Sequence, residues 1–166
     1  MTDDTVRFGL PQIATGQAQK EVTHNEALAR IDMLLHPVVE TMALAVPPAD
    51  PAAGRGWIVA AGGSGAWAGR AGQLAVWTDG GWRFATPVAG MLAWVTDSGV
   101  HARWTGETWA LGHWPVAALV VGGRPVVGAQ QPAIATPGGG ETVDIQARSA
   151  ISALLGALRN HGLITT

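Results

Sequence analysis

Cysteine and tyrosine are absent from this 166-residue sequence, and lysine occurs once, as Lys20. Without cysteine, disulfides and thiolate metal ligands are excluded. Charged residues make up 13% of the chain and the formal net charge is −2. No basic field exists to attract nucleic acid or an anionic membrane, so we expect neither as a partner. So weakly charged a surface instead predicts that protein partners cover much of it.

Targeting signals and long hydrophobic runs are also missing. Residues 1–5 lack the charged and apolar regions of a signal peptide. No apolar run approaches the roughly 20 residues that span a bilayer. We therefore expect synthesis in the cytoplasm, with any later location reached by assembly or lysis.

Signatures of catalysis and cofactor binding are equally scarce. The five histidines never lie three or four positions apart, which argues against a metal site. The glycine-rich stretch 62–72 matches neither phosphate-loop nor dinucleotide-binding spacing. We expect no cofactor, no metal and no enzymatic activity. Residues 46–115 contain four acids, so a carboxylate pair for glycoside hydrolysis is the one enzymatic alternative left open.

Tryptophan is abundant, and its spacing organises the centre of the chain. Seven of the eight tryptophans lie in residues 62–114, and three of them repeat at an offset of 27 positions. Such a period predicts a tandem repeat of one β unit. The repeated pairs are Trp67/Trp94, Trp77/Trp104 and Trp82/Trp109.

Each copy of the repeat carries a hairpin signal. Asp79-Gly80 suits a type I′ turn, and Gly106-Glu107 suits a type II′ turn. Either two-residue loop would place the two flanking tryptophans opposite each other as a cross-strand pair.

The remaining patterns predict an α+β fold that is mainly β. We expect an extended N-terminal arm at 6–14, a helix at 17–36, a strand from Gly56, a hairpin at 118–127 and a last helix capped by Asp144 and ended by Gly162. Thr15 is the expected cap of the first helix. The Pro-rich segment 46–51 suggests a linker, so the predicted domains are 1–45, 46–115 and 116–166.

Both helices carry apolar stripes that predict a homo-oligomer, either a trimer or a pentamer. The first helix has a narrow seam and a second, weaker apolar face, and the last helix has a broader stripe. The seam is His24, Leu28, Ile31 and Leu35; the weaker face is Ala18, Val22, Ala29 and Met33; the stripe includes Leu154 and Leu158.

The arm at 6–14 is apolar but interrupted by glycine and proline. Burying a Phe or Leu side chain stabilises a structure by roughly 1.5–3 kcal/mol. One hypothesis is that Phe8 and Leu10 anchor in another subunit or in a particle shell, with Arg7 pairing at the rim. The alternative is that the arm folds back on its own domain.

The tryptophans suggest carbohydrate binding, because the apolar C–H face of a sugar ring stacks on a flat indole. The pairs beside the hairpin loops are the candidates: Trp77, Trp82, Trp104 and Trp109. The alternative is that these side chains fill the core of a small β domain.

Several motifs are more specific than packing requires. The first is Leu10-Pro11-Gln12-Ile13-Ala14-Thr15-Gly16-Gln17 with its continuation to Leu28. The motifs that continue it are Pro47-Pro48-Ala49-Asp50-Pro51, Gly65-Ala66-Trp67-Ala68-Gly69 and Trp77-Thr78-Asp79-Gly80-Gly81-Trp82. Together they resemble, over roughly residues 6–112, a family of unknown-function proteins from alphaproteobacterial prophages and gene transfer agents. The tail, residues 125–135 and 147–163, is similar to the closing module of phage tail and spike proteins. The resemblance implies assembly into a virion-like particle and release by lysis.

The resemblance implies a particle component, such as a spike or fibre protein at the virion surface. It implies as partners a capsid or tail protein, a second spike or fibre protein, and host surface polysaccharide. A chain of this length favours a base or adaptor, with a carbohydrate-binding spike as the alternative. The family offers no catalytic motif.

Overall fold

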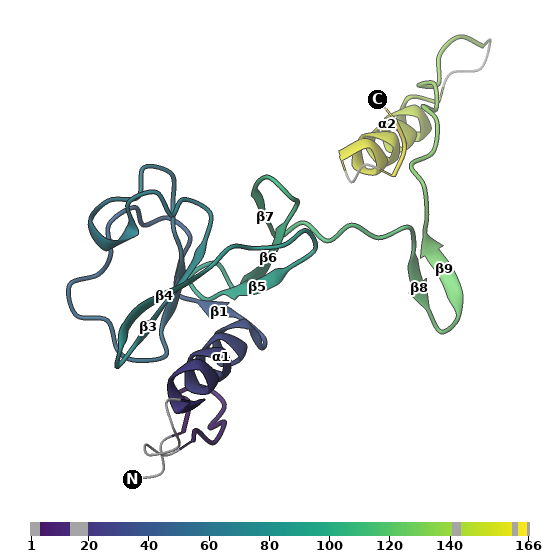
Figure 1. Cartoon of the computed structure of the whole chain (residues 1–166). Helices are drawn as coiled ribbons and strands as arrows, with labels where there is room; N and C mark the ends of the chain where they lie inside the picture. The colour runs from purple at the N-terminus through teal and green to yellow at the C-terminus, as the bar shows by residue number, and fades with distance from the viewer. Residues whose placement is uncertain (1–3, 14–19, 141–143, 161–162, 166) are drawn as a thin grey trace. The chain divides into compact units, whose positions relative to one another are not determined.

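The computed structural model describes residues 4–13, 20–140, 144–160 and 163–165 (Figure 1). They divide into two compact units, Met1–Trp114 and Pro115–Thr166. The fold is α+β and mainly β, as predicted. The elements are α1 (Lys20–Leu34), β1 (Val38–Val39), β2 (Gly56–Ile58), the 3-10 turn η1 (Gly65–Trp67), β3 (Leu74–Thr78), β4 (Gly81–Ala85), β5 (Leu92–Val95), β6 (Val100–Trp104), β7 (Trp109–Leu111), β8 (Leu119–Val121), β9 (Arg124–Val127) and α2 (Ile145–Asn160).

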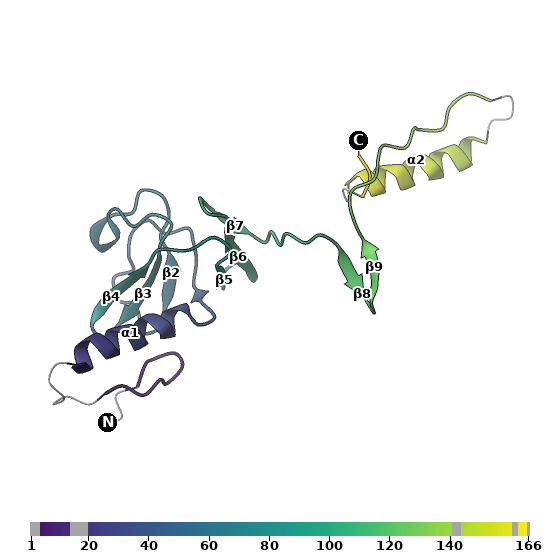
Figure 2. The same ribbon diagram turned by 45° about the vertical axis from the view of Figure 1, so that its right-hand side comes forward.

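The first unit contains two antiparallel three-stranded meanders, and the sequence repeat accounts for the hairpins β3–β4 and β6–β7 within them. The first meander, which we call the first copy, is β2–β3–β4. The second copy is β5–β6–β7, with β1 added parallel to β5 (Figures 1 and 2). Trp77 pairs with Trp82, and Trp104 pairs with Trp109. The predicted cross-strand tryptophan pairs are therefore confirmed.

The third repeated pair, Trp67 and Trp94, is not structurally equivalent. Trp67 lies in η1, inside the long connection between β2 and β3, whereas Trp94 lies within β5. The β5–β6 connection spans only residues 96–99 and has no room for such a turn. By strand register, the position of Trp94 opposite His101 corresponds to that of Ile58 opposite Leu74.

The first hairpin turn differs from the predicted type I′. Gly81 takes the positive φ of 95°, while Asp79 and Gly80 do not have positive φ values. This pattern matches a type I turn followed by a left-handed glycine, which spares Asp79 a strained conformation. In the second hairpin Gly106 has φ 114°, consistent with the predicted need for glycine there.

The two meanders stack face to back. The back of the first, including Leu74 and Val76, shares a core with the aromatic face of the second, represented by Ala102 and Trp109. The aromatic face of the first meander has a separate core around Trp57 and Trp67. The first meander is thus buried on both faces.

Helix α1 packs on the shared core through Met33, which is 2% exposed. Figure 2 shows the helix alongside the β2–β3–β4 sheet. Met33 belongs to the predicted weaker face, and Ala18 lies outside the described residues. The helix ends at Leu34, because His36 adopts a positive φ of 42° and Pro37 follows. The predicted start at residue 17 and the cap at Thr15 lie outside the described residues. Since α1 and β1 both join the first unit, the predicted segment 1–45 and residues 46–114 of the next predicted segment lie together within it.

The second unit has a local structure close to prediction and little core. Gly122 and Gly123 both have positive φ at the β8–β9 turn. Asp144 accepts a hydrogen bond from the Ala147 N–H at 2.8 Å and caps α2. The Leu163 N–H donates to the Leu158 carbonyl, the bond of a Schellman motif, although Gly162 lies outside the described residues. No helix within the described ranges is both long and apolar enough to cross a membrane.

Candidate functional site

The tryptophans proposed for sugar stacking in the first copy are packing residues of its core. Trp77 and Trp82 are half-buried. The Trp82 ring lies 5.2 Å from Trp67, 5.2 Å from Trp77 and 5.5 Å from Trp57, measured between centroids, with edge-to-face geometry. Such packing presents no coplanar row of free indole faces.

The corresponding pair in the second copy holds the two meanders together. Trp104 and Trp109 are half-buried, with ring centroids 5.5 Å apart. The Trp109 Nε1–H donates to the Gly72 carbonyl at 2.8 Å. A Cβ added to Gly72 would lie 3.3 Å from the Trp104 ring, so the contact is close.

An exposed aromatic surface lies on the back of the second meander instead. Trp94 is 37% exposed and Trp114 is 58% exposed. The His101 ring lies between them, with centroids 5.0 Å from Trp94 and 5.9 Å from Trp114 and both pairs near perpendicular. Neither Trp94 nor Trp114 was among the predicted site residues.

These rings line a groove of about 250 Å³, which we call the back-face groove, defined by Leu92, Trp94, His101, Arg103, His113 and Trp114. A neighbouring hollow shares Leu92, Trp94 and His101 and adds His36. Among the described residues that line the two hollows, the titratable side chains are three histidines and one arginine, with no carboxylate.

Arg103 is the most unusual member of the back-face groove. Its Nε atom is buried and has no hydrogen-bond partner among the described residues. Because that atom is enclosed by protein, a ligand in the groove would meet the rest of the side chain, and Arg103 as a whole is half-buried. A carboxylate or phosphate binds a guanidinium group through charge-assisted hydrogen bonds.

Strand alternation could have shown that Trp94 and Arg103 lie on the same face of the sheet. Ala93, Val95 and Ala102 are buried, so their neighbours Trp94 and Arg103 point to the opposite face of the sheet. The sequence alone did not show which face another element would cover.

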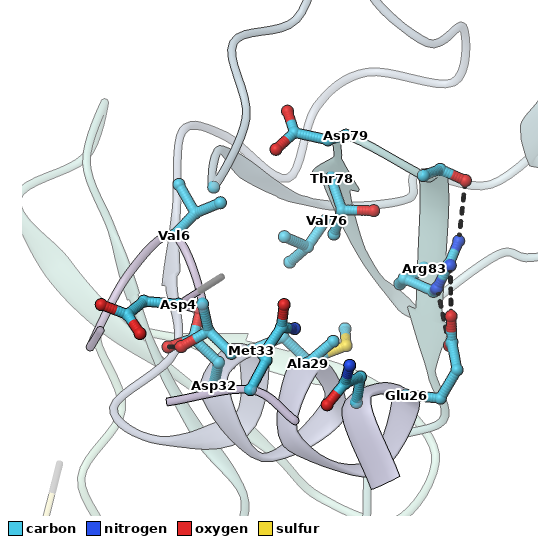
Figure 3. A pocket seen from close by; sticks show the side chains of 15 residues that line it. Asp4, Val6, Glu26, Ala29, Asp32, Met33, Val76, Thr78, Asp79 and Arg83 are labelled. Atoms are coloured by element: carbon cyan, nitrogen blue, oxygen red, sulfur yellow. Dashed lines mark hydrogen bonds and ion pairs between the residues drawn. The ribbon is translucent and has the colours of Figure 1, made fainter. Parts of the chain in front are cut away.

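A third hollow, of about 200 Å³, lies between α1, the N-terminal arm and the β3–β4 hairpin (Figure 3). On its rim the Arg83 guanidinium binds Glu26 at 2.9 and 2.5 Å. That hydrogen bond lowers the pKa of Glu26. No group of three or more potential metal ligands is found in the described parts of the chain.

The N-terminal arm folds back on its own helix, as the alternative hypothesis had it. The Asp32 carboxylate is buried and accepts hydrogen bonds from the Thr5 hydroxyl and from the backbone N–H groups of Arg7 and Phe8. The Arg7 side chain donates to three carbonyls at the end of α1, those of Asp32, Leu35 and His36. Arg7 therefore caps a helix of its own chain.

The proposed docking side chains remain accessible even so. Phe8 is 46% exposed and Leu10 is half-buried. On the α1 seam, Ile31 is 47% and Leu35 is 42% exposed, His24 is exposed and Leu28 is half-buried. On α2, Leu154 is 65% exposed and Leu158 is half-buried.

The fold and these surfaces define a class: a module of two stacked, tryptophan-rich meanders, joined to a poorly buried C-terminal unit. Residues 24–110 match the model of a family described as a protein of unknown function, DUF2793. The chain belongs to this family. A comparison with curated proteins finds no match.

Proposed function

We propose that this protein is a structural component of a phage-like particle, the base or adaptor of a spike or fibre at the particle surface. One observation carries the proposal. In the described part of the C-terminal unit, the buried hydrophobic side chains are Leu155 and Ile164. The exposed ones include Val116, Leu119, Val120, Val121, Val126, Val127, Ile134, Ile145, Ile151 and Leu154.

So much exposed apolar surface on a small unit is typical of a segment that is buried in an assembly. Both faces of the β8–β9 hairpin are exposed, and an isolated hairpin is marginally stable in water. The resemblance to prophage and gene transfer agent proteins supports the particle as the assembly. The exposed seam on α1 supports a closed homo-oligomer, because the same stripe on each copy can meet around a symmetry axis.

The test uses the full chain with an epitope tag, expressed in its native host, and particles purified on a density gradient. We expect wild type to co-sediment with particles and Leu154→Asp to be depleted from them. Ser149→Asp, which adds the same charge at another exposed position of α2, should be retained. Absence of the wild-type chain from purified particles would refute the proposal.

The arm requires a point variant, because deleting it would also remove the Arg7 cap and the partners of Asp32. Phe8→Asp keeps the Arg7 side chain and the backbone donors to Asp32, and removes the Phe8 ring beside the Arg7 guanidinium. Depletion of Phe8→Asp from particles would assign the docking contact to the arm, and normal incorporation would leave it to α2 or the α1 seam.

A second candidate function is attachment to a polysaccharide at the host surface. The observation that favours it is the back-face groove, where Trp94 and Trp114 offer exposed indole rings. Binding of host polysaccharide by wild type and its loss in Trp94→Ala would support this function. If Trp77→Ala stays folded and loses polysaccharide binding to the same extent, the binding site would be assigned to the first copy.

A further inference from the structure

We infer that the back-face groove selects an acidic saccharide, with the indoles of Trp94 and Trp114 stacking on sugar rings and Arg103 binding a carboxylate. The inference rests on the second candidate function and specifies its ligand. Three features of the groove lead to it: its place in the stack, its charge and its lack of a free strand edge.

The first feature is the position of the groove in the stack of meanders. It is seen by comparing equivalent positions in the two meanders. On the back of the first, Leu74 and Val76 are buried by the aromatic face of the second. At an offset of 27, the second meander has His101 and Arg103 at these positions. A further meander with an apolar face could not cover them without burying an unpaired guanidinium, which is costly. The groove is therefore built for a polar occupant.

The charge of the groove identifies that occupant as an anion. Its lining contains Arg103, His101 and His113 and no carboxylate among the described residues. No ion pair to Arg103 is found in the described ranges, and its Nε atom is buried without a hydrogen-bond partner. Guanidinium groups bind carboxylates through two parallel N–H···O bonds.

The strand arrangement favours a saccharide over an acidic peptide. The groove lies on β5 and β6, and each of these strands is already paired on both sides within β1–β5–β6–β7. A peptide that binds by strand addition needs a free edge, which this surface lacks. Side-chain contacts alone remain, and flat exposed indoles suit the C–H faces of pyranose rings.

Two glycines line the groove. Gly99 and Gly112 have φ values of 65° and 70°, a left-handed conformation that favours glycine. A Cβ at Gly99 would meet no heavy atom within 4 Å, so the backbone at that point of the groove is uncovered.

The test measures binding of tetragalacturonate and of its neutral methyl ester to the full chain, by isothermal titration calorimetry at low salt. We expect the acid to bind at least about tenfold more tightly than the ester, the effect of one charge-assisted hydrogen bond or more. Arg103→Gln should lose this preference while still binding the ester. Trp94→Ala should lose both ligands. Arg55→Gln, which removes an exposed arginine paired with Glu40, should behave as wild type.

The outcomes separate the two levels of the hypothesis. Equal binding of acid and ester would overturn the acidic preference and leave carbohydrate attachment standing. If the chain binds neither the acid nor the ester, the proposal of an acidic saccharide ligand would be overturned. The binding test with host polysaccharide would then decide the second candidate function separately. Tighter binding of hexaglutamate or of a thymidine 15-mer than of tetragalacturonate would assign the groove to an acidic peptide or to a nucleic acid. Circular dichroism of each variant checks that a loss of binding is not a loss of fold.

Discussion

The two copies of the repeat share a topology but differ in what covers them. In the first, Trp67 folds over the aromatic face from the long β2–β3 connection and is fully buried. In the second, the aromatic face is covered by the first copy, and the back face with Trp94 is exposed. Repeated sequence therefore gives the repeated hairpins β3–β4 and β6–β7, whereas the burial of Trp67 and Trp94 depends on the element that holds each one and on what covers it.

The largest expected difference in stability lies between variants of Trp67 and Trp94, which are 27 positions apart in the sequence repeat. Trp67→Ala should lower the free energy of unfolding by about 3–5 kcal/mol, because it leaves a large cavity in the core. Trp94→Ala should cost less than about 1 kcal/mol, since that side chain is partly exposed. Denaturation followed by tryptophan fluorescence measures both, because all eight tryptophans lie in the first unit.

Trp67→Phe refines this prediction. The Trp67 Nε1–H is buried without a hydrogen-bond partner among the described residues, so phenylalanine removes an unpaired donor while filling part of the space. It should cost clearly less than Trp67→Ala. Equal losses for Trp67→Ala and Trp94→Ala would refute the difference between the copies.

A smaller effect is expected where the copies meet. Trp109→Phe removes the hydrogen bond to the Gly72 carbonyl and leaves that carbonyl unpaired. It should cost about 1 kcal/mol more than Trp104→Phe, the matched change on the paired strand. The two variants are compared by urea denaturation, and indistinguishable midpoints would show that the bond does not stabilise the stack.

The smallest effect concerns an ion pair present only in the first copy. Arg83 binds Glu26 of α1, and the position of Arg83 in the second copy is occupied by Ala110. Glu26→Gln should cost about 0.2–1 kcal/mol at neutral pH, toward the low end because Glu26 is half-exposed.

The pH dependence of that loss is the diagnostic measurement. The hydrogen bond from Arg83 lowers the pKa of Glu26 below its ordinary value. Its contribution is therefore present above the ordinary glutamate pKa and is lost as the pH falls through the lowered one. Wild type and Glu26→Gln should become equally stable in acid. A difference that persists there would point to packing rather than charge.

Local patterns in the sequence determined the elements that depend on near neighbours. The hairpin registers follow from loop length and glycine placement, which is why Trp77 meets Trp82 and Trp104 meets Trp109. Asp144 caps α2 for an equally local reason. In β5 and β6, side chains alternate between the two faces of the sheet, and this alternation likewise places Trp94 and Arg103 on the same face.

Only the tertiary structure decided which face of each strand is buried. A strand presents side chains to both sides, and the covering element comes from a distant part of the chain or from another copy of the repeat. Four predicted sugar-binding tryptophans are half-buried for that reason, and Trp94 is exposed. The fold-back of the arm is a decision of the same kind, because Arg7 and Phe8 meet Asp32 across 25 and 24 positions of sequence. Contacts at that separation depend on which surfaces the whole fold brings together, so local sequence propensity does not predict them.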